Sequence, residues 1–202
     1  MVKTKKEALS IILTAASSYR KNLFGKTFLF VCQNRNDQSL YYFEANFDSV
    51  HFKHLTGVKT QIPSAQFWDF CINKRLAEDD FDFADDGTTE LKLDILPLVF
   101  DKIAMNMIGD YSGNKIKLFT EKVAGNVFAS IGFKKTKSGK YVPNTLLRED
   151  IRNITRRTDR ILMIYKKDHG MGRYEDMVYY TKKFDWEKIT LTSPYEYLPK
   201  PV

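Results

Sequence analysis

Two apolar runs joined by a polar turn decide the fold, and together they read KTFLFVCQNRNDQSLYYFEANF over residues 26–47. Both runs are rich in β-branched and aromatic residues, which favour extended strands, whereas the residues at 34–38 are typical of turns. The pattern predicts a β-hairpin, with one strand at 26–33 and a second at 39–47.

A helix is predicted directly before the hairpin. Thr4 and Glu7 have the spacing of a capping box, in which each side chain accepts a hydrogen bond from the backbone N–H of the other residue. Apolar residues follow at helical spacing as far as Leu23, and Gly25 supplies a stop signal. We therefore expect one helix to end where the hairpin begins.

Downstream of the hairpin, helices are predicted early and strands late. Residues 50–59 are predicted to be irregular, and helices are expected at 63–76 and from Asp94 to about Ile108, with an acidic loop at 78–90 between them. Strand patterns lie at 115–120, 126–133, 159–167 and 176–183. This order predicts an α+β fold with an N-terminal helix and hairpin, a helical insertion and a mostly antiparallel sheet.

The chain is expected to form one domain over residues 1–184, with the helical and acidic insertion at about 63–109 and an extended C-terminal tail at 185–202. Its 202 residues suit a single domain, and a hydrophobic content of 43% with 14% aromatic residues is that of a folded protein. No internal repeat or linker divides the sequence.

The sequence predicts a soluble protein of the cytosol, without a membrane partner. No apolar run reaches the roughly 18 residues that a membrane span needs, and the N-terminus does not have the pattern of a secretory signal. Cys32 and Cys71 lie inside apolar segments, so we expect buried free thiols rather than a disulfide framework.

The positive charge lies in the second half of the chain. Residues 1–109 carry 13 Lys and Arg against 14 Asp and Glu, whereas residues 110–202 carry 19 against 11, within a total of +7. Such an excess is expected if one face binds the phosphates of RNA or another polyanion. A role in solubility alone explains the charge equally well.

The first candidate site is the segment HFKHLTG at 51–57, which we place at the end of a strand. RNA cleavage without a metal needs a base for the 2′-hydroxyl, an acid for the leaving oxygen and a cation for the charged intermediate, and histidine and lysine supply all three. His54 is the candidate acid or base, and His51 is a reserve proton carrier. A structural histidine is the competing interpretation. A metal site has less support, since only His169 remains as a third histidine, and we expect no metal and no other cofactor.

The second candidate site is a stripe of arginines. If residues 146–157 form a helix, arginines four residues apart lie on one side of it, where their guanidinium groups can bind successive phosphates. The alternative is a solvated face whose arginines pair with neighbouring carboxylates. The nucleic-acid-binding residues predicted here are Arg148, Arg152, Arg156, Arg157 and Arg160, with Lys134 and Lys135 nearby.

Four tyrosines on or near the last strands are weaker candidates for stacking on bases, namely Tyr165, Tyr174, Tyr179 and Tyr180. Aromatic residues in strands more often pack in the core or across strands.

The segment FKHLTG at 52–57 resembles the fourth phage-associated nuclease family of the barnase–EndoU–colicin–RelE (BECR) group. The resemblance also includes YYFE at 41–44, YVPNTLL at 141–147 and ILMIYK at 161–166, so it spans the chain from about residue 8 to about 182.

This resemblance implies a helix-plus-antiparallel-sheet fold with a concave face for RNA. It further implies a metal-independent endoribonuclease toxin that acts in the cytosol of a host cell. His54 and Thr56 match the family motif, with Lys166 as a cationic partner on a later strand. An antidote protein or a host defence nucleoprotein is a possible partner. The alternative is a non-catalytic nucleic-acid or nucleoprotein-binding module, such as an anti-defence or host-takeover protein, that uses the basic C-terminal half.

Overall fold

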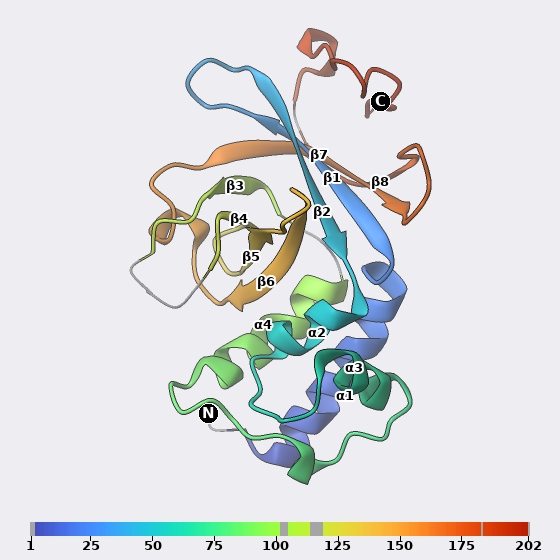
Figure 1. Cartoon of the computed structure of the whole chain (residues 1–202). Helices are drawn as coiled ribbons and strands as arrows, with labels where there is room; N and C mark the ends of the chain where they lie inside the picture. Colours follow the sequence, from blue (N-terminus) through green and yellow to red (C-terminus); the bar gives the residue numbers. More distant parts are fainter. Residues whose placement is uncertain (1–2, 102–104, 114–118, 183, 202) are drawn as a thin grey trace.

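The computed structural model describes residues 3–101, 105–113, 119–182 and 184–201. Its helices gather at one end of the molecule and its strands at the other (Figure 1). The α-helices are α1 (Lys5–Asn22), α2 (Ser49–Thr56), α3 (Ser64–Ile72) and α4 (Thr88–Asp101). The strands are β1 (Lys26–Gln33), β2 (Leu40–Phe47), β3 (Met107–Asp110), β4 (Lys122–Gly125), β5 (Ser130–Lys135), β6 (Tyr141–Leu147), β7 (Asp159–Asp168) and β8 (Asp176–Tyr180). The α+β prediction is confirmed.

The N-terminal helix and the hairpin form as predicted. Thr4 and Glu7 make both hydrogen bonds of the capping box at the start of α1. β1 and β2 pair antiparallel from Lys26 opposite Phe47 to Gln33 opposite Leu40. Local sequence signals are sufficient for these elements because their caps, periodicity and turn all agree.

The sheet closes on itself. Its strands lie in the order β1-β2-β6-β5-β4-β3-β7-β8, and β1 also pairs antiparallel with β7 along its whole length. The first seven strands of that order therefore form a barrel. Among the described strands, β8 pairs only with β7, at residues 163–166, further along the strand than residues 159 and 160, which pair with β3. Each pairing is antiparallel except the short contact between β2 and β6.

The inside of the barrel is filled by aromatic side chains. Phe30, Phe43 and Phe133 come from three different strands, and their ring centroids lie 5.2–6.2 Å apart. All three side chains are buried, and they belong to the same apolar core as the buried faces of the helices. This core holds the helical layer against one end of the barrel.

A second core lies on the outer face of β1 and β7. Strand residues such as Val31 and Tyr165 are buried there against Ile189, Leu191 and Leu198 of the C-terminal segment. That segment contains the short 3-10 helix Trp186–Lys188 and lies at the end of the molecule opposite α1–α4 (Figure 1).

The prediction for residues 50–59 is wrong. Ser49–Thr56 forms the helix α2, which ends at Gly57 with a left-handed backbone (φ 73°). The backbone N–H of Asp48 donates a hydrogen bond to His51 Nδ1 over 3.0 Å. A histidine in the third position of the helix thus takes the role that Glu or Gln fills in a capping box, so the sequence has an N-cap residue, Asp48, but lacks the second half of the usual signature.

The prediction of a helix at 146–157 is also wrong. Leu146 and Leu147 continue strand β6, opposite Ile131 and Ser130 of β5. Only the short 3-10 helix Ile151–Asn153 follows, and the Asp150 side chain caps it by accepting a hydrogen bond from the Arg152 N–H. Pairing with β5 takes only Leu146 and Leu147 from the expected helix, and the arginines that follow lie in the 3-10 turn and in irregular backbone.

Other predicted helix and strand boundaries also differ from the structure. α4 spans Thr88–Asp101 rather than starting at Asp94, and Met107–Asp110 forms the strand β3. A Cβ at Gly109 would lie 2.4 Å from the Arg157 carbonyl oxygen, so the glycine belongs to a tight strand contact rather than a helix end. Of the strand predicted at 126–133, residues 126–129 form the turn after β4, and only residues 130–133 belong to a strand, β5. Of the strand predicted at 115–120, residues 115–118 lie outside the described residues.

The remaining structural predictions concern cysteines and membranes. Cys32 and Cys71 are free and buried, as predicted. Within the described ranges, no helix has both the length and the apolar character that crossing a membrane requires.

Replacing Phe30 with alanine is expected to lower the free energy of unfolding by about 3–5 kcal/mol, because it leaves a cavity between the two aromatic neighbours. Urea denaturation followed by circular dichroism measures this change. The matched control Phe128→Ala removes a ring that is 75% exposed and should change stability by no more than about 0.5 kcal/mol. Equal effects of the two substitutions would contradict the described core.

Candidate active site

The two histidines of the 51–57 segment are placed by α2, which begins directly after β2. His51 and His54 are three residues apart, so they neighbour each other on the helix surface. Because His51 Nδ1 accepts a hydrogen bond from the Asp48 N–H, its neutral ring carries the proton on Nε2. His51 therefore presents a hydrogen-bond donor away from the helix.

Burial lowers the pKa of His51 from the ordinary value of 6.5 to about 4. The negative charge of Asp48 opposes this shift, while the positive charges of Lys134, His54 and His169 add to it. Protonation of Nδ1 would also break the hydrogen bond that starts α2. His51 is thus held neutral at pH 7 by three separate effects.

The His54 side chain is exposed, in contrast to that of His51. The pKa of His54 is lowered mainly by the partial burial of its ring. The positive charges of Lys134, Lys53 and Lys92 lower this pKa further. Its imidazole is therefore mainly neutral at pH 7 and able to accept a proton. The same lysines give its surroundings a positive potential.

The third histidine of the chain joins this group from a distant part of the sequence. His169 follows β7, and its backbone N–H donates a hydrogen bond to the Gly25 carbonyl oxygen over 2.8 Å. Its Nδ1 lies 3.3 Å from Oδ1 of Asp48. We call Asp48, His51, His54, Lys134 and His169 the histidine cluster. No three His, Cys, Asp or Glu side chains in the described part of the chain are arranged to hold a metal ion.

Thr56 has a structural environment. Its side chain is fully buried, and its hydroxyl donates a hydrogen bond to the Lys53 carbonyl oxygen over 2.7 Å. The Thr56 hydroxyl oxygen in turn accepts a long hydrogen bond of 3.4 Å from the Val58 N–H. Thr56 thereby fixes the end of the helix that carries both histidines.

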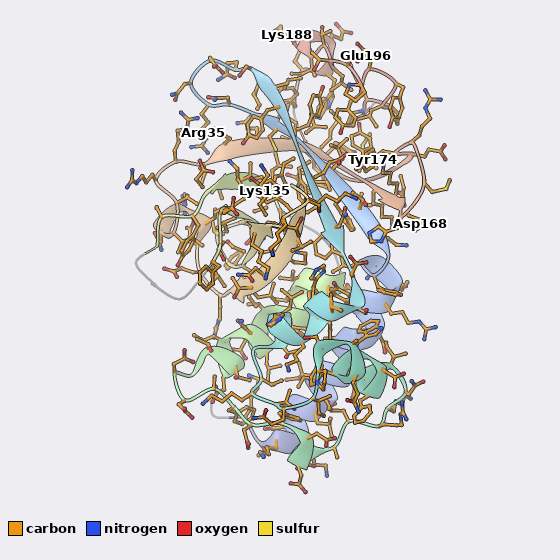
Figure 2. All side chains as sticks on the ribbon, in the orientation of Figure 1. Arg35, Lys135, Asp168, Tyr174, Lys188 and Glu196 are labelled. Carbon is orange, nitrogen blue, oxygen red and sulfur yellow. The ribbon has the colours of Figure 1, made fainter. Side chains whose placement is uncertain are left out.

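A cleft of about 500 Å³ opens on the outer face of the sheet, over β2 and the start of β6. One wall is the turn before Tyr141. The other is the end of β7 with the turn that follows it, where Lys167 and Gly170 lie on either side of His169. Figure 2 shows Lys135 and Asp168, which adjoin these walls, on opposite sides of β2. The polar lining of this outer cleft comprises Thr27, Tyr42, Glu44, Asn46, Lys140, Tyr141, Lys167 and Tyr195.

The predicted stripe of arginines does not exist as one surface. Arg148 Nη1 lies 2.6 Å from Asp94 Oδ2 on α4, and Arg152 pairs with Asp150 beside it. Arg156 and Arg157 instead line a separate cleft of about 520 Å³ that also contains Lys122, Asp110 and Tyr111. Arg157 lies 3.4 Å from Asp159.

Strand register places part of this segment far from the histidines. Arg160 lies opposite Gln33, at the turn end of the hairpin, whereas Asp168 lies opposite Lys26, at the end where α2 begins. The two ends are seven residues apart on β1, or about 23 Å at roughly 3.3 Å per residue. The histidines and the arginine segment 148–160 therefore do not form one continuous site.

The predicted lysines also separate. Lys134 belongs to the histidine cluster, and Lys135 lies with its Nζ 5.8 Å from the centre of the Tyr141 ring. Lys166 pairs with Asp176 over 3.1 Å and lines a smaller groove of about 280 Å³ with Lys21 and other charged residues. Its described contacts do not include the histidine cluster.

Sequence reasoning missed several residues of the site. The sequence predicted no role in the site for Lys140, Lys167, Glu44 or Tyr195. No local pattern marks them, because the pairing of β1 with β7 and the docking of the C-terminal segment bring them together.

Comparison with known families identifies the chain. Residues 11–183 match the family described as phage-Barnase-EndoU-ColicinE5/D-RelE like nuclease4. The chain belongs to this family. A search of curated proteins found no match, and a search of solved structures found none either. The suspected BECR relationship is thus confirmed, and nucleic acid is the substrate that this nuclease family implies. The histidine cluster lies wholly within the matched residues.

We expect His51→Gln to weaken the pH dependence of stability. The pKa of His51 is lower in the folded protein than in the unfolded chain. The neutral ring therefore contributes fully to the free energy of unfolding above pH 6.5, and this contribution is lost as the pH falls towards 4. Glutamine keeps an acceptor for the Asp48 N–H but does not titrate. Urea denaturation of both proteins between pH 7 and pH 4 should show a smaller loss in the variant. Identical losses would contradict the neutral, capping His51.

Proposed function

We propose that the protein is a metal-independent endoribonuclease that cleaves RNA by attack of the 2′-hydroxyl on the adjacent phosphate. The observation that supports this most is the gathering of all three histidines with Lys134 beside a basic cleft, in a member of a nuclease family. Such a group contains the proton carriers and the cation that this chemistry requires.

His54 is the proposed base. It is exposed, it is neutral at pH 7 because burial and three lysines lower its pKa, and α2 holds it at the surface. A neutral imidazole can take the proton of the 2′-hydroxyl as the oxygen attacks phosphorus. Thr56 acts through the backbone, because its buried hydroxyl fixes the helix end next to His54.

His51 and Lys134 are the proposed groups that stabilise the charged intermediate. The Nε2–H of His51 can donate to a phosphoryl oxygen without any change of protonation, since Nδ1 is engaged by Asp48. Lys134 is exposed and close enough to lower the pKa of both helix histidines. A fixed donor and a cation aimed at the phosphate favour the transition state over the ground state.

His169 is the proposed acid for the leaving 5′-oxygen. Asp48 Oδ1 lies 3.3 Å from its Nδ1 and can orient the ring. The leaving oxygen then gains a proton from His169 while His54 retains the one taken from the 2′-hydroxyl. Exchange with water restores both histidines.

The remaining cations are proposed to bind the RNA backbone outside the reacting centre. Lys140 and Lys167 line the outer cleft, and Lys167 lies two residues before His169 in the sequence. More distant backbone contacts are proposed for Arg148, Arg152, Arg156, Arg157, Arg160, Lys135 and Lys166. This activity would take place in the cytosol of the host cell, where an antidote protein could block the cleft.

The second candidate is a nucleic-acid-binding module without turnover. Two side chains of the 51–57 segment, His51 and Thr56, have structural hydrogen bonds that a non-catalytic protein would also need. In that case the basic surface binds nucleic acid, and the loss of His54 has no effect on function.

The substitution His54→Ala is expected to slow RNA cleavage by at least about 100-fold, the lower range of what a general base contributes. Cleavage of a labelled RNA under single-turnover conditions, in the presence of a chelator, measures the rate. RNA affinity should change little, because the lysines remain.

The matched control is Val50→Ala, which alters an exposed apolar residue on the same helix. It should retain the parent rate. Unchanged cleavage by the His54 variant would eliminate this mechanism, and absence of cleavage by the parent protein would favour the binding module.

A further inference from the structure

The C-terminal segment 184–201 lies outside the residues that match the family, which end at 183. It is nevertheless docked on the sheet, with Ile189, Leu191 and Leu198 buried against the outer faces of β1 and β7. Tyr165 strengthens this attachment by donating a hydrogen bond to the Pro199 carbonyl oxygen over 2.5 Å. The segment is therefore an integral part of this protein's surface.

This segment contributes Tyr195 to the outer cleft. The Tyr195 hydroxyl donates to Glu44 Oε1 over 2.8 Å, and its ring centroid lies 4.5 Å from that of Tyr42. Tyr42 is itself held by the segment, because its hydroxyl accepts a hydrogen bond from the Thr192 N–H over 2.8 Å. Both rings are thus fixed in place and only partly buried.

Glu44 reinforces the position of Tyr195. The same oxygen, Oε1, also accepts a hydrogen bond from the Tyr174 hydroxyl over 2.7 Å. Tyr174 is buried beneath Lys167, whose Nζ lies 4.4 Å from the centre of its ring. One carboxylate therefore ties the C-terminal segment to the wall of the cleft that carries Lys167.

An aromatic pair next to lysines is the combination that binds single-stranded nucleic acid. An unpaired base can stack on a tyrosine ring while lysines neutralise the adjacent phosphates. In the outer cleft, Tyr42 and Tyr195 supply the rings, and Lys140 and Lys167 supply the charges. The bases of a duplex are already stacked on one another and are not available for this contact.

We propose that the C-terminal segment completes the RNA site, with Tyr195 and Tyr42 forming a platform on which an unpaired base of the substrate stacks. The substrate is therefore single-stranded RNA, held with its phosphates towards the histidine cluster. This inference rests on the proposed function, because it concerns the same cleft. It adds a specificity-determining residue that lies outside the matched family residues.

The test is a binding experiment on the full chain that carries His54→Ala, so that cleavage does not interfere. Fluorescence anisotropy measures the affinity for a labelled single-stranded oligoribonucleotide and for an RNA duplex of the same sequence. Tyr195→Leu keeps an apolar side chain of moderate size, whereas Tyr195→Phe keeps the ring and loses only the hydroxyl. Phe128→Ala removes an exposed aromatic ring outside the cleft and is the control.

We expect Tyr195→Leu to weaken single-strand binding by about tenfold, the order of magnitude of one lost stacking contact. Duplex binding should be unchanged, and Tyr195→Phe and Phe128→Ala should stay within about twofold of the parent. If Tyr195→Leu binds the single strand as tightly as the parent does, this inference is wrong and the proposed function is not affected. If the parent binds neither RNA, the proposed function fails together with the inference.

Discussion

The antiparallel pairing of β1 with β7 is the contact on which the rest of the structure depends. It joins segments more than a hundred residues apart and closes the sheet into a barrel, with Lys26 opposite Asp168. The end of β7 is thereby carried to the start of α2, where His169 meets Asp48. The outer faces of the same two strands also form the platform on which the C-terminal segment packs. Both the histidine cluster and the outer cleft follow from this one closure.

The electrostatics of the site serve two purposes at once. The lysines around α2 lower the pKa of His54 and also attract phosphate groups. Lys92 is a special case, since burial lowers its pKa to about 8 and its side chain covers Gly57 at the end of the helix. A neutral base within a positive field suits a reaction in which negative charge develops on a phosphate.

The sequence predicted those elements whose signals are local. The cap at Thr4, the hairpin at 26–47 and the α+β class are correct because propensity, periodicity and turn residues agree. The helix α2 was missed because a histidine provides its N-terminal acceptor. The expected arginine helix does not form, because strand β6 continues to Leu147 and only a short 3-10 helix capped by Asp150 follows it. The partners of the histidines could not be predicted, since long-range strand register decides which residues meet.

The chemistry of the cleaved ends tests the central claim most directly. Purified protein and RNA are incubated with a chelator, and the termini of the products are analysed alongside a substrate that carries a 2′-deoxy sugar at the cleavage site. The account predicts 2′,3′-cyclic phosphate ends and no cleavage at the deoxy position, because the 2′-oxygen is the attacking group. Products with 3′-hydroxyl ends, or cleavage that requires added divalent metal, would contradict it.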